Sequence, residues 1–374
     1  MTSIIVAGDV CPAGRVAQLS DEGNYEVVYQ ELKPFLDDVA YSIVNLEAPI
    51  VRGEAAPIKK SGPNLKCGPS VIKALKYAGF KGVTLANNHF YDYGEVGASS
   101  TLDELESNGF DVVGGGKNLT EATRTLYVDL NGTVFAFINC CEQEFSIATD
   151  TTGGSNPLDV ISQYHAIREA REKADHIVEI VHGGVEMYQL PTPRMKKTYR
   201  FFIDSGADVV VNHHQHCFSG FEYYRGKPIV YGLGNLCFDW RGRSPIWYQG
   251  YLARLTFDKD RDSVQLTPIP YSQCEETPSI HVQQKNDAFE RRLLELNAII
   301  ADDNELRNKY QQLLAQTRDS YDVLNPYANR FLFRLYLKGF LPKFMPSSRL
   351  YGILNSIRCD SHRERMLDAI EHML

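Results

Sequence analysis

The chain has 374 residues, of which 43% are hydrophobic and 23% are charged, so it can bury a large core and a wholly disordered chain is excluded. Its formal net charge is −8, which disfavours nucleic acid as a partner because phosphate binding needs a basic face. A small anionic substrate is still compatible with this charge, since a bound metal ion can set the local sign.

The first two-thirds of the chain alternate short strand-like runs with helix-like patterns. Strands are expected at residues 4–7, 41–44, 82–86, 176–181 and 208–211. Helices are expected at residues 70–77, 95–107, 158–173 and 194–204. This alternation predicts a layered α/β fold, and strands that are apolar throughout fit a parallel sheet covered on both faces.

Antiparallel pieces interrupt this pattern. Asn131-Gly132 divides the apolar stretch of residues 126–140, and Asn-Gly between apolar runs is a strong hairpin signal. Further hairpins are expected around residues 226–228 and between residues 251–257 and 264–269. The mixture of parallel and antiparallel strands predicts a sandwich or a mixed sheet instead of a Rossmann domain.

The pattern becomes helical beyond about Pro278. We therefore predict one domain over residues 1–278 and a helical C-terminal extension over residues 279–374. One long helix is expected over residues 288–314, and one or two short helices are expected over residues 349–374.

A basic and aromatic segment, residues 329–349, lies within this extension. It contains five basic and five aromatic side chains and no acid. The favoured interpretation is that its aromatic rings pack on the first domain while the basic groups stay solvated. The alternative is a contact surface for an anionic membrane, a protein partner or an anionic polymer.

The cysteines and the N-terminus favour a cytoplasmic location. The eight cysteines form no CxxC pair, so scattered free thiols in a reducing compartment are expected. The first strand follows Met1-Thr2-Ser3 directly, without the basic and apolar regions of a signal peptide. No run approaches the roughly 20 apolar residues of a membrane span.

Residues capable of chemistry occur where the predicted strands end. In chain order these are Asp9, then Glu47, then Asn87, Asn88 and His89, then His182, and finally His213, His214 and His216. Because ligand sites in α/β sheets form at the carboxyl ends of strands, we expect these residues to converge in space. Mixed nitrogen and oxygen ligands suit Zn, Mn, Fe or Ni better than Ca.

Structural roles are the alternative for each residue taken singly. Asp9 and Asn88 suit helix N-caps, and Glu47 could be an ordinary loop carboxylate. Three histidines within four residues are harder to explain in this way, because the whole chain has only 10. We interpret Glu186 and Asp239 as structural or supporting residues. A Cys11 thiol, two residues after Asp9, is expected to be buried and is less favoured as a nucleophile or ligand.

These residues make the chain resemble the bacterial CapA family, associated with capsule and poly-γ-glutamate synthesis, within the calcineurin-like metallophosphatase superfamily. The resemblance covers roughly residues 3–240. It consists of five blocks in the expected order, which are Ala7-Gly8-Asp9-Val10 with Arg15, Val44-Asn45-Leu46-Glu47-Ala48-Pro49, Leu85-Ala86-Asn87-Asn88-His89 with Asp92-Tyr93-Gly94, Val181-His182-Gly183-Gly184 with Glu186, and residues 208–216 continued by residues 226–235.

The resemblance implies a four-layer α-β-β-α metallophosphoesterase-like sandwich with a divalent metal site. The implied ligands of one or two Mn, Zn or Fe ions are Asp9, Glu47, Asn88, His182, His214 and His216. His89 is then the acid that assists the leaving group, with Asp92 orienting it. Arg15 and His213 are predicted to contact the substrate.

The chain departs from the family's pattern at several positions. Gly183 stands where the family commonly has an aromatic residue, and Asn212 and Gln215 alter a loop that usually reads Gly-His-His-Pro-His. Cys11 stands where the superfamily usually has a histidine, so both a one-ion and a two-ion site stay open.

Two functions follow from these observations. The first is a metal-dependent hydrolase acting on a phosphate ester, or on a γ-glutamyl or other amide bond. Its substrate would be an anionic small molecule or polymer in capsule or poly-γ-glutamate synthesis. The second is a non-catalytic metal- or polymer-binding component of a surface-polymer synthesis complex. Metal binding with turnover would distinguish the first from the second.

Overall fold

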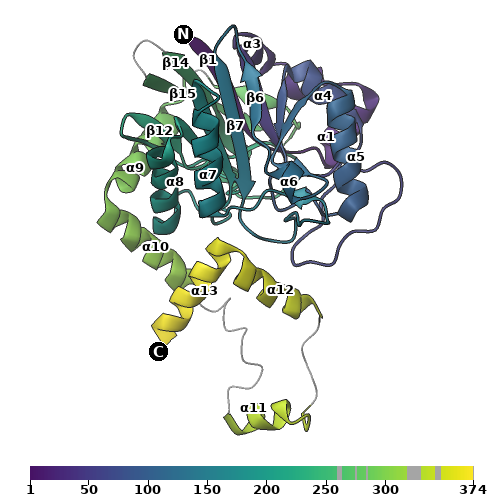
Figure 1. Cartoon of the computed structure of the whole chain (residues 1–374), viewed down its shortest axis with the longest axis vertical. Coiled ribbons are helices and arrows are strands. Elements are labelled where there is room, and N and C mark those ends of the chain that lie inside the picture. The colour runs from purple at the N-terminus through teal and green to yellow at the C-terminus, as the bar shows by residue number, and fades with distance from the viewer. Residues whose placement is uncertain (259–262, 274–275, 284, 318–329, 342–346, 374) are drawn as a thin grey trace.

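The computed structural model of the chain describes residues 1–258, 263–273, 276–283, 285–317, 330–341 and 347–373. Two β-sheets lie face to face at its centre, and helices cover their outer faces (Figure 1). The predicted four-layer α-β-β-α sandwich is therefore confirmed.

The first sheet is eight-stranded, with strands in the order β16-β15-β14-β1-β2-β3-β4 and with β13 paired to the end of β1. Strands β1 to β4 are parallel, and β14 to β16 form an antiparallel extension. The bounds are β1 (Thr2–Cys11), β2 (Tyr41–Leu46), β3 (Gly82–Thr84), β4 (Asp111–Val113), β13 (Asn235–Phe238), β14 (Gln249–Asp258), β15 (Ser263–Gln273) and β16 (Ile280–Val282). The sheet thus continues to Val282, past the predicted end of the first domain at residue 278.

The second sheet is six-stranded, in the order β11-β12-β10-β9-β7-β6. Its four inner strands are parallel, and β6 and β11 pair antiparallel at the edges, as the predicted hairpins require. The bounds are β6 (Leu126–Asp129), β7 (Val134–Cys141), β9 (His176–His182), β10 (Val209–His213), β11 (Phe221–Tyr224) and β12 (Lys227–Val230). Two short strands, β5 (Gly115–Gly116) and β8 (Gly154–Ser155), pair separately.

Helices cover the two outer faces of the sandwich. The first sheet is covered by α1 (Gly14–Glu22), α2 (Glu26–Tyr29), α3 (Lys33–Asp37), α4 (Ser70–Ala78) and α5 (Gly94–Ser107). The second sheet is covered by α7 (Val160–Arg171) and α8 (Pro193–Ser205), while α6 (Leu119–Ala122) and the 3₁₀ helix η1 (Pro245–Tyr248) lie in connections. Helix α8 begins where the sequence predicts, because the Thr192 side chain accepts the Met195 N–H at 3.2 Å and Pro193 suits the first helical position.

The core explains why the strands are apolar along their whole length. In β1, Ile4 and Val6 point between the two sheets, whereas Ile5 and Ala7 point toward the helices. All four side chains are fully buried, so alternation of polar and apolar residues is absent from this strand.

The C-terminal extension differs from the predicted single helix over residues 288–314. Two helices, α9 (Asp287–Ala301) and α10 (Asp303–Thr317), are separated at Asp302, whose carboxylate accepts the N–H groups of Asn304 and Glu305 at 2.8 and 3.1 Å. This N-cap stops one helix and starts the next. Helix α9 belongs to the core, since Phe289 and Leu296 are buried with the residues between the sheets.

Three further helices follow, α11 (Arg330–Leu337), α12 (Ser347–Arg358) and α13 (Asp360–Met373). In Figure 1, α11 lies apart from the sandwich, whereas α12 and α13 lie beneath it. Phe340 is 74% exposed, so this ring does not pack on the first domain. Residues 329 and 342–346 of the basic and aromatic segment lie outside the described residues, and a membrane or protein contact through this segment stays a prediction. None of the described helices is both long and apolar enough to cross a bilayer.

Candidate metal centre

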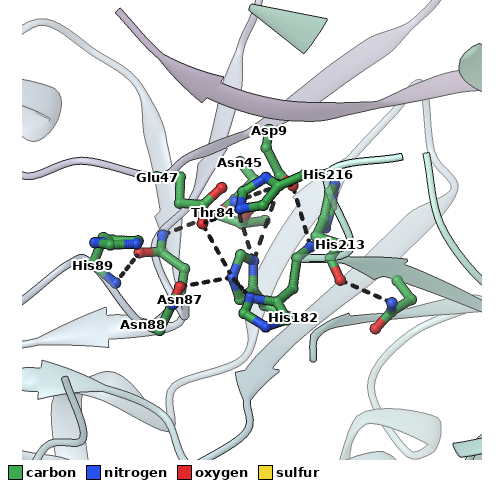
Figure 2. Close-up of polar contacts among 12 residues, drawn as sticks. Asp9, Asn45, Glu47, Thr84, Asn87, Asn88, His89, His182, His213 and His216 are labelled. Atoms are coloured by element: carbon green, nitrogen blue, oxygen red, sulfur yellow. Dashed lines mark hydrogen bonds and ion pairs between the residues drawn. The ribbon is translucent and has the colours of Figure 1, made fainter. Parts of the chain in front are cut away.

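The carboxyl ends of the central strands bring the predicted ligands together. The parallel pairing of β1 with β2 sets Asp9 beside Asn45, and that of β9 with β10 sets His182 beside His213. The loops that follow β2 and β10 supply Glu47, His214 and His216. Figure 2 shows the side chains of Asp9, Glu47, His182 and His216 pointing toward one another. The predicted convergence of strand ends is therefore confirmed.

Glu47 lies at the centre of this cluster. Its Oε1 is 3.5 Å from His182 Nε2 and 3.8 Å from His216 Nε2. Two groups have potential ligand atoms within 4.8 Å of one another: Glu47 with His182 and His214, and Asp9 with Glu47 and His216. Because Glu47 belongs to both groups, its carboxylate could serve as a ligand at either position.

The environment of Glu47 fits a metal ligand. The residue is completely buried, and neither carboxylate oxygen has a hydrogen-bond partner among the described residues. Burial raises its pKa well above the usual range, and the charges of Asp9 and Glu186 raise it further. An ionised carboxylate in such a place is unfavourable unless a cation satisfies it. The orphaned oxygens and the mixed donor set therefore fit divalent transition metals.

Two of the histidines, His182 and His216, are held in the neutral form that binds metals. Burial lowers the pKa of His182 well below its usual value, and the neighbouring His214 and His213 lower it further. Burial likewise lowers the pKa of His216. A neutral imidazole keeps one ring nitrogen as a lone-pair donor.

Neighbouring amides orient the ligands. The His216 Nδ1–H donates a hydrogen bond to Asn235 Oδ1 at 2.9 Å, which leaves His216 Nε2 facing Glu47. Asn45 donates to Asp9 Oδ1 at 2.7 Å, and Asn88 Oδ1 lies 3.0 Å from His182 Nε2. Partners of this kind fix ligand orientation and tautomer.

The histidine loop after β10 has a strained backbone. His214 and His216 have φ angles of 87° and 54°, in the left-handed region that residues other than glycine seldom adopt. The His214 N–H donates to Asp9 Oδ2 at 3.2 Å, which ties this loop to β1. Such strain persists where the surrounding structure imposes it and is concentrated at functional sites.

A second group, His89, Asp92 and Lys60, lies beside the cluster. His89 Nδ1 is 2.6 Å from Asp92 Oδ2, the contact predicted to orient the histidine. Asp92 also forms an ion pair with the buried Lys60, whose Nζ lies 3.1 Å from His89 Nδ1. Burial lowers the pKa of His89, and the Lys60 charge contributes in the same direction although Asp92 opposes it.

A cavity of about 550 Å³ opens onto both groups. His89, Asn88 and His216 form part of its wall. Its remaining lining residues include Lys60, Glu144, Glu186, Phe238, Trp240, Arg243, Trp247, Asn355 and His362. Asn355 and His362 belong to α12 and α13, so the C-terminal extension completes the wall.

The structure places two predicted substrate contacts elsewhere. The Arg15 guanidinium forms a two-point ion pair with Asp239, with contacts of 3.0 and 2.5 Å, and donates to the Glu276 carbonyl at 2.7 Å. His213 is buried with its Nε2 2.9 Å from the Ala7 carbonyl oxygen. Neither residue belongs to the wall of the cavity.

Cys11 is buried among apolar residues of the layer between the first sheet and its helices, and burial raises the pKa of its thiol well above the usual value. It belongs to neither ligand group around Glu47.

Sequence reasoning did not single out Lys60, Glu144, Asn355 or His362. Lys60 lies in a loop between β2 and α4 that has no periodic pattern. Glu144 follows β7, and the other two come from helices more than 200 residues further along. Asn45 and Asn235 occur within the motif blocks, so the sequence could have indicated their roles. Asn45 lies two residues before Glu47, and Asn235 begins β13.

An α-β-β-α sandwich with a buried histidine, carboxylate and amide cluster at its strand ends defines a metallophosphoesterase-like protein. The model of the family described as "Bacterial capsule synthesis protein PGA_cap" matches residues 3–240, which is more than half of the chain. The chain belongs to this family.

Two curated relatives carry names of the same kind. A Bacillus anthracis protein named "Capsule biosynthesis protein CapA" is 29% identical over 245 residues, covering 63% of this chain and 60% of its own length. A Bacillus subtilis strain 168 protein named "PGA biosynthesis protein CapA" is 29% identical over 278 residues, covering 72% of each chain.

Solved structures with a similar layout include the calcineurin-like phosphoesterase YfkN from Bacillus subtilis, at 15% identity and a TM-score of 0.39, covering 85% of this chain and 98% of that one. Another is a 5'-nucleotidase precursor from Thermus thermophilus, at 14% identity and a TM-score of 0.47, covering 79% of this chain and 57% of that one.

Proposed function

We propose that this protein is a metal-dependent hydrolase that acts on phosphate esters in capsule or poly-γ-glutamate synthesis. The observation that carries the proposal is the buried Glu47 carboxylate, without hydrogen-bond partners among the described residues and shared by two potential ligand groups. A purely structural role would leave both oxygens of a buried carboxyl group unsatisfied. The family and the names of the two relatives supply the biosynthetic context.

The described residues divide between two ion positions. Glu47, His182 and His214 form one set, with Asn88 adjacent, and Asp9, Glu47 and His216 form the other. One or two ions of Mn, Zn or Fe suit these donors. Such ions, when bound, supply an activated water and offset negative charge on the phosphoryl oxygens.

His89 is positioned to give a proton to the leaving group. It lies in the cavity wall, directly after Asn88 in the chain, and Asp92 holds its Nδ1 side. This leaves the Nε2 side for a leaving oxygen. A positioned acid of this type contributes typically 10²- to 10⁴-fold to rate.

The cavity favours an anionic substrate near these groups. Lys60 and Arg243 both line it, and Arg243 lies over the rings of Trp240 and Trp247 at 4.6 and 5.1 Å. Cations in a partly enclosed cavity attract phosphate oxygens more strongly than exposed ones do. We therefore place a phosphate ester ahead of a γ-glutamyl amide as the substrate class.

The test combines metal analysis with turnover. The purified protein, loaded with Mn²⁺ or Zn²⁺, is assayed with p-nitrophenyl phosphate, bis-p-nitrophenyl phosphate and γ-glutamyl-p-nitroanilide. A double variant, His214→Ala with His216→Ala, should lose both metal and turnover. His281→Ala is the matched control, because His281 is half-exposed, pairs with Glu31 and does not line the cavity.

Phosphate-ester turnover that disappears with the double variant supports the proposal. If the protein turns over only the γ-glutamyl compound, the substrate class is a γ-glutamyl amide and not a phosphate ester. Bound metal with no turnover of any substrate would favour the non-catalytic, metal- or polymer-binding component.

A further inference from the structure

A second cluster of potential metal ligands lies in the wall of the same cavity. Glu144, Cys359 and His362 each offer one ligand atom, and these atoms lie within 4.8 Å of one another. Glu144 follows β7, Cys359 is the residue between α12 and α13, and His362 lies in the first turn of α13. Tetrahedral zinc with bonds of about 2.0–2.3 Å sets its ligand atoms roughly 3.3–3.8 Å apart, so a small contraction would close the cluster on an ion.

Buried contacts hold the turn between α12 and α13 in place. The Glu142 carboxylate accepts the Ser361 N–H at 3.1 Å and the Ser361 hydroxyl at 2.8 Å. Arg194 of α8 pairs with the same carboxylate and reaches Glu364 at 3.1 Å. Gly183 makes room for this arrangement, since a Cβ atom there would meet Glu142 Cγ at 2.7 Å. The cluster is therefore fixed by the fold on both of its sides.

Asn355 provides an independent observation at the cluster. It is only 8% exposed and lines the cavity beside Glu144 and His362. Its Nδ2 donates to Glu144 Oε2 at 3.0 Å, whereas its Oδ1 has no hydrogen-bond partner among the described residues. A buried amide oxygen without a partner is unfavourable, and a cation next to Glu144 would satisfy it.

We propose that Glu144, Cys359 and His362 bind a zinc ion, distinct from the ions around Glu47, in the wall that the C-terminal extension contributes to the cavity. Thiolate, imidazole and carboxylate donors together favour Zn²⁺ over Mg²⁺ or Ca²⁺. A dication also balances the charges of Glu144 and a Cys359 thiolate, while Arg194 balances Glu142.

The Cys359 thiol donates a hydrogen bond to Glu142 Oε2 at 3.2 Å. Metal binding would release that proton, because only the thiolate is a strong ligand.

Cobalt substitution tests the site with a signal that the centre at Glu47 cannot give. The full-length protein is stripped of metal with a chelator and titrated with Co²⁺, and absorption is recorded in the near ultraviolet. A thiolate bound to Co²⁺ gives an intense charge-transfer band there. The ligands around Glu47 contain no sulfur, so the band reports on Cys359. We expect the wild-type protein to show it and to bind one more ion than Cys359→Ser.

Three variants make the outcome decisive. His362→Ala keeps the thiol and should weaken the Co²⁺ affinity at this site at least tenfold. Cys11→Ser should keep the band, because Cys11 is buried in another layer. The His214→Ala and His216→Ala double variant should keep the band while losing the other ions, which separates this proposal from the proposed function.

A wild-type protein without the band, or a band that survives in folded Cys359→Ser, overturns the proposal. Circular dichroism establishes whether each variant is folded. If Cys359→Ser does not fold, His362→Ala becomes the deciding variant. An unchanged Co²⁺ affinity in His362→Ala then overturns the proposal.

Discussion

Replacing Glu47 by glutamine should change stability in opposite directions with and without metal. In the metal-free protein, folding raises the pKa of this buried carboxyl. A carboxyl group whose pKa is raised on folding makes its full contribution to folding stability below its unfolded pKa of about 4.3. This contribution is lost as the pH rises above that value. At neutral pH, metal-free Glu47→Gln should therefore melt at a higher temperature than the metal-free wild type, and this advantage should shrink as the pH is lowered toward 4.

The metal-bound wild type should show the reverse order. A ligand present at one hundred times its Kd, and bound only by the folded state, stabilises that state by about 2.7 kcal/mol. At about 2.1 cal/mol/K of unfolding entropy per residue, this is a rise in Tm of about 3 °C for 374 residues. Glu47→Gln should lose most of that rise, because the amide lacks the charge and the second ligand oxygen.

Scanning calorimetry with Mn²⁺ or with chelator provides the measurement, and Glu179→Gln is the control. Glu179 is also completely buried, has one oxygen without a hydrogen-bond partner among the described residues and has a pKa raised by burial. It is three residues from His182 on β9 and so faces away from the metal centre. Its variant should keep the full metal-induced rise. An equal rise in Glu47→Gln and the wild type would refute the assignment of Glu47 as a ligand.

Three other substitutions separate the roles of the remaining residues. His89→Ala should lower kcat by about 10²- to 10⁴-fold while metal content, measured by elemental analysis, stays at the wild-type level; a parallel loss of metal would make His89 a ligand. Glu142→Gln should lower the free energy of unfolding by about 3–5 kcal/mol in denaturant titrations, because Arg194 loses its buried partner. A decrease of less than about 1 kcal/mol would contradict the importance of this ion pair. Gly183→Ala should lower it by about 1–3 kcal/mol through overpacking against Glu142, and an unchanged midpoint would show that the carboxylate moves aside freely.

The sequence predicted the parts of the site that depend on local pattern. Apolar runs that end in Asp9, Asn88 or His182 identify the ends of buried strands, and parallel pairing makes such ends neighbours. The Asn131-Gly132 turn was likewise predicted, because a two-residue hairpin depends on the residues of the turn itself.

Features that depend on distant partners were not predicted. Arg15 has the charge of an anion contact, yet Asp239, brought near by β13, holds it. The break at Asp302 interrupts an apolar periodicity that continues on both sides, although the following Asn304-Glu305 pair resembles a helix start. No pattern within residues 347–373 shows that His362 reaches the cavity, because the Glu142 contact that places it spans the chain.

Gly183 links the metal centre to the C-terminal helices. It admits the Glu142 side chain, and Glu142 in turn holds the turn that carries Ser361. Because Gly183 directly follows His182, a larger side chain at this position would displace Glu142 and would disturb both the ligand cluster and the cavity wall to which α12 and α13 contribute.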